Sequence, residues 1–314
     1  MDSPREPPLM TLTAGVVGLG RMGGNMARRL VDEGIDVVGT DARPEAVADL
    51  EAAGGRGRSS PAAVARAVDV VVSSLPDPPT VEAVYTADDG LLAGADAETV
   101  VLETSTIDPD TTASLADRGV DVLAAPVSGG PEDCRDGTLT VIVGGERSVF
   151  EREDVAAVCS ALGRTVHYAG GIEAGHTLKL LNNVMSMGNL LLAMEALSLG
   201  AARGVDGEVM LSVLGDAGGS SNQFRKRAPR VLNRHFDPGF TVDFGEKDLG
   251  LALDTADETT HPMPVTSLVH SLFVEASAKG YGTEDAAAVV KLFEETADAR
   301  VEADGHVDEA FEGY

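Results

Sequence analysis

The sequence is poor in the residues that cross-link, stack and carry positive charge. Its 314 residues contain no tryptophan, two cysteines and 4% aromatic residues. Cys134 and Cys159 are too few and too scattered for a disulfide framework or a zinc site. We therefore expect no metal centre, and we expect the protein to be located in the reducing cytoplasm.

Positive charge is also scarce, since 24 Lys and Arg face 51 Asp and Glu and give a formal net charge of -27. This charge excludes nucleic acid and anionic membranes as partners, so an anionic ligand must be held by local groups. The acidic residues are dispersed along the chain, which is typical of salt-accumulating halophiles. No uninterrupted apolar run reaches the ~18 residues of a membrane span, and the first ten residues lack the apolar core of a signal peptide.

Short β-branched runs alternate with alanine-rich stretches through the first half of the sequence. This alternation predicts a parallel α/β sheet of the Rossmann type. The runs occupy residues 14–17, 36–40, 68–75, 100–104, 120–124, 139–143 and 165–168.

After Gly175 the strand-like runs stop, and loop signals at 215–219, 237–240 and 261–264 separate helical stretches. We predict an N-terminal dinucleotide-binding domain over residues 1–170 and an all-α domain over 171–314, joined by a long helix. An acidic tail from about residue 303 is expected to be loosely held.

A glycine-rich turn follows the first predicted strand directly and opens a helix. It reads Gly18-Leu19-Gly20-Arg21-Met22-Gly23. In this context the first glycine permits a tight turn, the second admits a pyrophosphate and the third allows close packing of helix on strand. The motif predicts a nicotinamide dinucleotide on the helix N-terminus.

Asp41 ends the second predicted strand, close to the ~20-residue spacing expected for a carboxylate that binds the adenosine ribose. Its charge would repel a 2′-phosphate, so NAD is favoured. Arg43 would instead attract that phosphate, so NADP stays possible, and Asp41 alone is also compatible with a turn cap.

Three further strand ends carry small or polar residues. Ser128, Gly129 and Gly130 follow the strand at 120–124, where backbone N–H groups and a hydroxyl would hold a carboxylate; a simple tight turn explains them equally well. Residues 104–106 and the pair Leu75-Pro76 would line the cofactor cleft, or would serve as helix caps and turns.

Lys179 interrupts an apolar helical stretch in a chain whose lysines lie only at 179, 226, 247, 279 and 291. Asn183 lies one turn further on the same helix face. A snorkelling side chain and a proton-exchanging group explain Lys179 equally well. Desolvation in a cleft disfavours the ammonium form, which suits alcohol–carbonyl interconversion.

Together these motifs resemble the β-hydroxyacid dehydrogenases, and within them the 3-hydroxyisobutyrate dehydrogenase branch. The resemblance runs from about residue 11 to about residue 293. It rests on Gly18-Leu19-Gly20-Arg21-Met22-Gly23-Gly24-Asn25-Met26-Ala27, Ser105-Thr106-Ile107-Asp108-Pro109, Pro126-Val127-Ser128-Gly129-Gly130, Gly137-Thr138-Leu139, Lys179-Leu180-Leu181-Asn182-Asn183 and Lys247-Asp248-Leu249.

The resemblance implies hydride transfer between NAD and a short 3-hydroxy acid, with Lys179 as the catalytic lysine. Ser128, Gly129 and Asn183 would contact the substrate, a small carboxylate. The implied cofactor contacts are Leu75, Pro76, Thr80, Thr106 and Lys247. From the residues alone, we would interpret Lys247 as forming an ion pair with Asp248 at the start of a helix. Relatives of this kind form homodimers or homotetramers.

Reductases of tartronate semialdehyde, or of related short aldehyde acids and sulfonates, share every one of these motifs and remain the alternative. A non-catalytic dinucleotide-binding regulator is the alternative from another class, disfavoured by Lys179 and Asn183. Imine reductases of similar fold usually lack the lysine. Decarboxylating 6-phosphogluconate dehydrogenases are much longer and place histidine where this chain has Asn182.

Departures from the family pattern bear on substrate identity. Ala124 stands where many relatives carry Asp, residues 132–134 replace small residues, and Glu173 replaces a glycine. A basic cluster, Arg225, Lys226, Arg227 and Arg230, would recognise a second anionic group, or forms a solvated helix face or an intersubunit contact.

Overall fold

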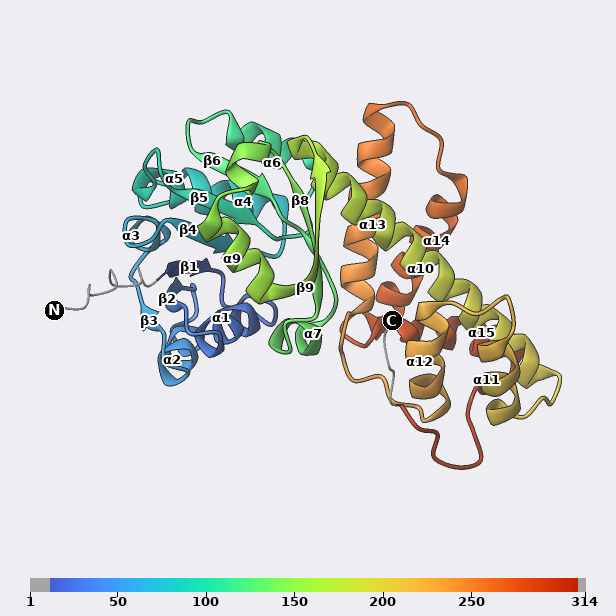
Figure 1. Ribbon diagram of the computed structural model, residues 1–314. Coiled ribbons are helices and arrows are strands. Elements are labelled where there is room, and N and C mark those ends of the chain that lie inside the picture. Colours follow the sequence, from blue (N-terminus) through green and yellow to red (C-terminus); the bar gives the residue numbers. More distant parts are fainter. Residues whose placement is uncertain (1–11, 310–314) are drawn as a thin grey trace, which may run out of the picture. The chain divides into compact units, whose positions relative to one another are not determined.

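The computed structural model describes residues 12–309 (Figure 1). The chain divides into two compact units, Met1–Lys179 and Leu180–Tyr314. The first unit alternates strands with helices, and the second is helical. The α/β domain followed by an all-α domain, predicted from the sequence, is therefore confirmed.

The first unit is built on one nine-stranded sheet. Its strands are β1 (Thr13–Val17), β2 (Asp36–Thr40), β3 (Arg56–Gly57), β4 (Val70–Ser73), β5 (Val100–Glu103), β6 (Asp121–Ala124), β7 (Val127–Ser128), β8 (Leu139–Gly144) and β9 (Gly163–Gly170). Its helices are α1 (Gly23–Asp32), α2 (Pro44–Ala52), α3 (Pro61–Ala65), α4 (Pro78–Thr86), α5 (Leu91–Gly94), α6 (Pro109–Ala116), α7 (Pro131–Arg135), α8 (Arg147–Phe150) and α9 (Glu153–Leu162).

Strand order in the sheet is β3-β2-β1-β4-β5-β6-β8-β7, with β9 beside β8. The first six strands are parallel and follow the doubly wound order, in which the chain reverses its direction of winding between β1 and β4. β8 runs antiparallel to β6 and β7, so an antiparallel edge adjoins the predicted parallel sheet. Residues 125–138, which hold the two-residue β7 and the five-residue helix α7, connect β6 to β8.

Both faces of the sheet are buried, because successive strand residues point to opposite sides. On β5, Val100 and Leu102 pack into one hydrophobic cluster with α1, α2 and α9. Val101 points to the other face and joins a second cluster with α3, α4 and α6. This burial explains the continuous β-branched runs of the central strands and leaves their carboxyl ends as the place for ligands.

The long helix α10 (Ile172–Ala202) leads from the first unit into the second. Further helices follow it: α11 (Gly207–Asp216), α12 (Asn222–Leu232), α13 (Val242–Glu258), α14 (Pro264–Ala276), a π-helical turn η1 (Ser277–Tyr281), a 3₁₀ turn η2 (Ala286–Val289) and α15 (Val290–Ala297). The second unit has its own core, in which Leu190, Met194 and Leu197 of α10 are fully buried.

Within residues 12–309, α10 is the helix that is long and apolar enough to cross a membrane by length and composition alone. The sequence offers no uninterrupted apolar run of that length, because Lys179, Asn182 and Asn183 interrupt this helix. A third (33%) of its most apolar window is buried within the protein.

The acidic C-terminal stretch is held more firmly than its composition predicts. Val301 and Val307 are buried in the core of the second unit. Asn233 donates to the Val307 carbonyl at 2.7 Å and accepts from its N–H at 2.8 Å. The expectation of a loosely held tail was therefore wrong at Val307, whose side chain is buried and whose backbone is bound to Asn233; residues 310–314 lie outside the described range.

Candidate active site

The glycines of the predicted fingerprint meet three different steric demands. Gly18 has a φ of 86°, and a Cβ there would lie 2.2 Å from the Ser74 carbonyl oxygen. A Cβ on Gly23 would lie 1.9 Å from the Gly18 carbonyl oxygen, so this helix start tolerates only glycine. A Cβ on Gly20 would meet no protein atom within 4 Å. The turn is closed on its inner side and open where a pyrophosphate would approach.

The helix that follows the turn begins without a side-chain cap. Met22 occupies the cap position of α1 and accepts no hydrogen bond through its side chain. Ser60, Asp77 and Asp108 do cap α3, α4 and α6, each accepting from a backbone N–H in the first turn. The Gly24 N–H donates to the Gly20 carbonyl at 2.8 Å, and no side chain caps the turn, so its dipole favours an anion such as the cofactor pyrophosphate.

Asp41 lies beside the fingerprint at the end of β2. Its Oδ2 accepts from the Leu19 N–H at 2.7 Å, and its Oδ1 accepts from the Arg43 N–H at 2.9 Å and from Arg43 Nε at 3.1 Å. Burial alone would raise the pKa of Asp41, but the hydrogen bonds from Arg43 and Leu19 outweigh burial and hold that pKa below its ordinary value. The side chain is therefore a carboxylate at neutral pH, with a lone pair on Oδ2 still able to accept from a ribose hydroxyl.

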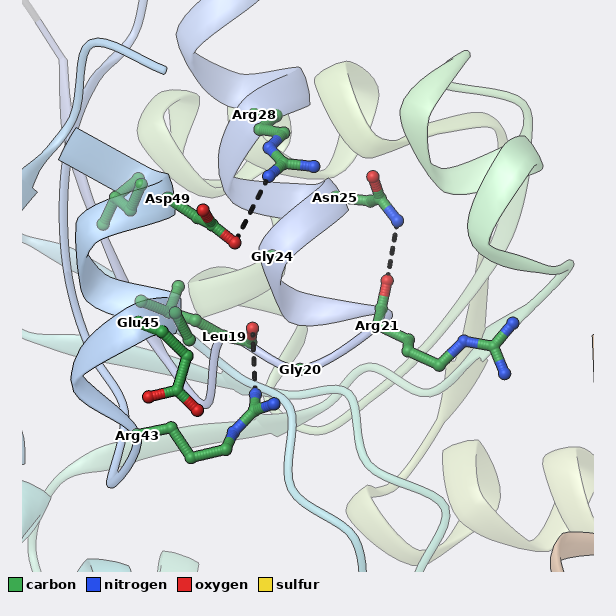
Figure 2. A pocket seen from close by; sticks show the side chains of 11 residues that line it. Leu19, Gly20, Arg21, Gly24, Asn25, Arg28, Arg43, Glu45 and Asp49 are labelled. Atoms are coloured by element: carbon green, nitrogen blue, oxygen red, sulfur yellow. Dashed lines mark hydrogen bonds and ion pairs between the residues drawn. The ribbon is translucent and has the colours of Figure 1, made fainter. Parts of the chain in front are cut away.

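A pocket of about 220 Å³ adjoins this carboxylate (Figure 2). Its lining comes from the fingerprint turn, α1 and the start of α2: Leu19, Gly20, Arg21, Gly24, Asn25, Arg28, Arg43, Glu45, Ala46, Asp49 and Leu50. The Arg43 guanidinium turns toward the Leu19 carbonyl, and Arg28 faces Asp49 at 3.9 Å. The pocket has the place and the mixed polar lining expected for the adenosine end of a dinucleotide.

The residues predicted at the ends of β4 and β5 divide into internal and accessible groups. Thr104 donates to the Ser73 carbonyl at 2.7 Å, and Ser105 Oγ accepts from the Leu75 N–H at 2.8 Å, so both hydroxyls are tied inside the unit. Pro76 is exposed, and Thr106 is half-buried. Thr80, also half-buried, lies in the first turn of α4. Leu75, Pro76, Thr80 and Thr106 thus reach the surface of the unit.

The loop after β6 is ordered by its own glycines and by Asp133. Gly129 has a φ of 137°, which favours glycine, and a Cβ there would lie 2.6 Å from Leu139 Cδ2. The Gly130 N–H donates to Asp133 Oδ2 at 2.6 Å. This N–H was expected to be open to a substrate carboxylate; Asp133, at the third position of α7, already occupies it. The half-buried Ser128 and the exposed Gly129 remain as the candidate contacts of this loop.

Lys179 is buried, with 8% of its surface exposed. The start of α10 packs against the sheet edge that carries the loop after β6. A Cβ on Gly175 would lie 3.0 Å from Ala124 Cβ and 3.2 Å from the Gly144 backbone N, so helix and strands meet almost backbone to backbone. Lys179 follows one turn after Gly175, so the backbone of this helix turn lies near the carboxyl end of β6.

His176 is a residue that the sequence reasoning missed. It is fully buried one turn before Lys179, and neither ring nitrogen has a hydrogen-bond partner. Burial lowers the pKa of His176 to about 3, although Asp108 opposes the shift, so the imidazole is neutral at physiological pH. The signal in the sequence was its i, i+3 spacing to Lys179 on an apolar helix.

Asn183 lies one turn after Lys179 on α10, where it is 5% exposed. Its Nδ2 donates to Asp248 Oδ2 at 2.6 Å, and its Oδ1 accepts from Asn182 Nδ2 at 3.1 Å. Lys247 Nζ lies 3.0 Å from Asp248 Oδ1. The ion pair read from the sequence is therefore present, although it lies within α13 and not at its start. Asp248 fixes the Asn183 amide and leaves its second N–H for a ligand.

Two arginines of the basic cluster on α12 pair with a buried carboxylate, whereas Arg225 is exposed. Arg227 is 6% exposed and its Nε donates to Asp285 Oδ1 at 2.9 Å, while Arg230 lies 3.8 Å from the same carboxylate and donates to the Asp237 carbonyl at 2.7 Å. The expectation of a solvated face or an anion site was thus wrong for these two arginines. Removing one partner of such a buried pair costs about 3–5 kcal/mol, which marks a structural role.

Within residues 12–309, no group of three or more His, Cys, Asp or Glu side chains is arranged to hold a metal ion. Cys134 and Cys159 are buried free thiols, and burial raises the pKa of each to about 12. They are therefore inert at neutral pH.

Two protein families match the chain in sequence. The NAD-binding domain of 6-phosphogluconate dehydrogenase matches residues 13–170, and the NAD-binding domain of NADP-dependent 3-hydroxyisobutyrate dehydrogenase matches residues 173–293. Together with the fingerprint turn and the doubly wound sheet, these matches define a nicotinamide-dependent oxidoreductase.

Individual relatives cover nearly the whole chain. A 2-(hydroxymethyl)glutarate dehydrogenase from Eubacterium barkeri is 34% identical over 91% of this chain and 96% of its own length. An NAD-dependent L-serine dehydrogenase from Pseudomonas aeruginosa is 34% identical over 89% and 97%. The structure of Mycobacterium tuberculosis 3-hydroxyisobutyrate dehydrogenase with L-serine is 28% identical, has a TM-score of 0.83 and covers 90% and 99%. The chain belongs to the β-hydroxyacid dehydrogenase family.

Proposed function

We propose that this enzyme oxidises a short 3-hydroxy acid with NAD, as a 3-hydroxyisobutyrate dehydrogenase does. The observation that carries the proposal is the burial of Lys179 on α10, one turn after Gly175, which packs against Ala124 at the end of β6. Relatives named for 2-(hydroxymethyl)glutarate, L-serine and 3-hydroxyisobutyrate support a substrate with a hydroxyl on the β-carbon of a carboxylic acid.

In this proposal the cofactor is held along the fingerprint turn. The uncapped first turn of α1 binds the pyrophosphate, and Asp41 accepts from the adenosine ribose hydroxyls. Leu75, Pro76, Thr80 and Thr106 contact the other half of the dinucleotide. Lys247 contacts the cofactor as well. When bound, NAD supplies the acceptor for the substrate hydride.

The protein residues orient the substrate and move a proton. Ser128 donates its hydroxyl to the substrate carboxylate, and Gly129 lets the backbone approach it without a side chain in the way. The second N–H of the Asn183 amide holds the substrate without titrating. Lys179 Nζ takes the proton from the substrate hydroxyl during oxidation and returns it during reduction.

Assembly and location belong to the same proposal. Leu178, Met185, Leu192 and Leu199 recur every seven residues along α10 and are 44%, 68%, 66% and 66% exposed. An apolar stripe of this kind favours a homodimer or homotetramer, which light scattering coupled to size-exclusion chromatography will detect. The two free thiols support a reducing cytoplasm.

A substrate panel tests the proposed activity. NAD reduction is measured in molar KCl with 3-hydroxyisobutyrate, L-serine, 2-(hydroxymethyl)glutarate, glycerate, 3-hydroxypropionate and sulfonated analogues. We expect the highest kcat/KM with 3-hydroxyisobutyrate, 3-hydroxypropionate, L-serine or 2-(hydroxymethyl)glutarate. A preference for glycerate or a sulfonate would favour the short aldehyde-acid or sulfonate reductases instead. NADH binding without turnover of any of these acids would favour a binding protein without catalysis.

A further inference from the structure

A carboxyl group lies buried under the half of the sheet where the nicotinamide end of the cofactor is expected. Glu103 ends β5 and is 0% exposed, as is Tyr85 of α4. Glutamate is almost never fully buried unless its oxygens are satisfied. None of the roles assigned above uses this residue.

Both carboxyl oxygens of Glu103 are hydrogen-bonded. Tyr85 Oη donates to Oε2 at 2.8 Å, and the Ser105 N–H donates to Oε1 at 2.7 Å. Burial raises the pKa of Glu103, and the bonds from Ser105 and Tyr85 oppose that rise. Burial also raises the pKa of Tyr85, which keeps its hydroxyl a donor. Glu103 is therefore fixed in one orientation.

The network continues from Glu103 into the neighbouring loops. Ser105 Oγ accepts from the Leu75 N–H at 2.8 Å, which joins the end of β5 to the end of β4. The Glu103 carbonyl oxygen accepts from the Ala125 N–H at 2.8 Å, which joins the end of β5 to the start of the loop that carries Ser128. One buried residue thus connects three strand ends.

The position of these strand ends decides which part of the cofactor they face. The strand order reverses between β1 and β4, and the adenosine half belongs to β1 and β2, where Asp41 lies. The ends of β4 and β5 therefore face the nicotinamide half. We propose that Glu103, acting through Ser105, is a positioning residue that sets the Leu75 and Thr106 loops for the nicotinamide half of the cofactor. The proposal rests on the cofactor placement proposed above.

The test compares binding of the whole cofactor with binding of its adenosine half. Ser105→Ala removes the acceptor for the Leu75 N–H and keeps the backbone bond to Glu103. NADH affinity is measured by the change in its own fluorescence, and adenosine 5′-monophosphate affinity by calorimetry. We expect NADH to bind about three- to tenfold more weakly, the range for one lost hydrogen bond, with the affinity for the monophosphate within about twofold of wild type.

Two further variants separate positioning from general stability. Glu103→Gln retains size and an acceptor for the Ser105 N–H, so it should restore most of the NADH affinity that Glu103→Leu loses. Val101→Ala, a truncation on the same buried strand, should lower the melting temperature and leave the ratio of the two affinities unchanged.

An unchanged ratio of NADH to monophosphate affinity in both Ser105→Ala and Glu103→Leu would overturn the proposal, as would an equal loss in Val101→Ala. If Ser105→Ala does not fold, Tyr85→Phe, which removes one bond to Glu103, is measured for the same ratio. Wild-type protein that binds NADH but oxidises none of the panel acids would refute the proposed activity and leave this test intact.

Discussion

Asp41 and Arg43 lie at the same site, but the Asp41 charge favours NAD and the Arg43 charge favours NADP. In the structure Arg43 is folded onto Asp41, whose carboxylate accepts from it through both backbone and side chain. Arg43 can reach a 2′-phosphate only by leaving this pair, and the Asp41 charge then repels the phosphate. The pair therefore favours NAD over NADP.

Replacing Asp41 with serine should shift preference toward NADP. Like charges placed together cost several kcal/mol, so we expect the ratio of kcat/KM for NADP to that for NAD to rise by about tenfold or more. Asp49→Ser is the control, since Asp49 lines the adjoining pocket, is 71% exposed on its side chain and pairs with Arg28. Equal ratios in wild type and Asp41→Ser would remove Asp41 from its assigned role.

Some single residues could be predicted from local pattern alone and others could not. The fingerprint turn could be predicted because part of it is local: a Cβ on Gly23 would meet the carbonyl oxygen of Gly18 within the same motif. The burial of Arg227 depends on Asp285, 58 positions away in the sequence. Glu103 and His176 are likewise defined by partners or surroundings that only folding brings near. Composition marked Arg227 as a surface charge for that reason.

Among the elements, α10 is the one whose contact with the sheet depends on glycines. Gly144 and Gly175 allow its first turns to approach the sheet, because a Cβ on Gly144 would lie 2.6 Å from the Gly171 carbonyl oxygen. The sequence predicted this helix from its apolar length and its lysine. It predicted the strand β8 but not its antiparallel direction. It did not predict the short β3 and β7, because two-residue strands have no periodicity to detect.

The stability that His235 gives to the stretch after α15 should depend on pH. His235 Nδ1 lies 2.8 Å from Glu309 and Nε2 lies 2.9 Å from Asp237. Glu309, and then Asp237, raise the pKa of His235 above its ordinary value of 6.5. A raised folded-state pKa means that the stabilisation is fully present below pH 6.5 and is lost as the pH rises through the folded-state value.

We therefore expect His235→Gln to lower the urea midpoint at pH 6 and to have little effect at pH 9, in constant molar KCl. The effect at pH 6 should be modest because His235 is 42% exposed on its side chain. His306→Gln, at an exposed histidine of the same stretch, is the control. A midpoint difference of equal size at both pH values would show that His235 acts by packing and not by charge.

For the whole molecule, the net charge of -27 should make the melting temperature and the activity depend on salt concentration. Self-repulsion between surface carboxylates is screened over ~10 Å at 0.1 M salt and ~3 Å at 1 M salt. We expect the melting temperature and the activity to rise together as KCl increases from 0.1 to 2 M. A variant with Asp254, Asp257 and Glu258 changed to their amides should need less salt. A melting temperature that is the same at both salt concentrations would refute the halophilic hypothesis.

In the proposed function, turnover of the whole enzyme depends most on Lys179, the group that exchanges the proton. The direct measurement is the kcat of Lys179→Met with the best panel substrate, together with NADH affinity. We expect kcat to fall by about 10²- to 10⁴-fold, with NADH affinity within about twofold of wild type, while Lys279→Met, at an exposed lysine paired with Glu295, keeps wild-type turnover. Near-wild-type turnover in Lys179→Met would contradict the account.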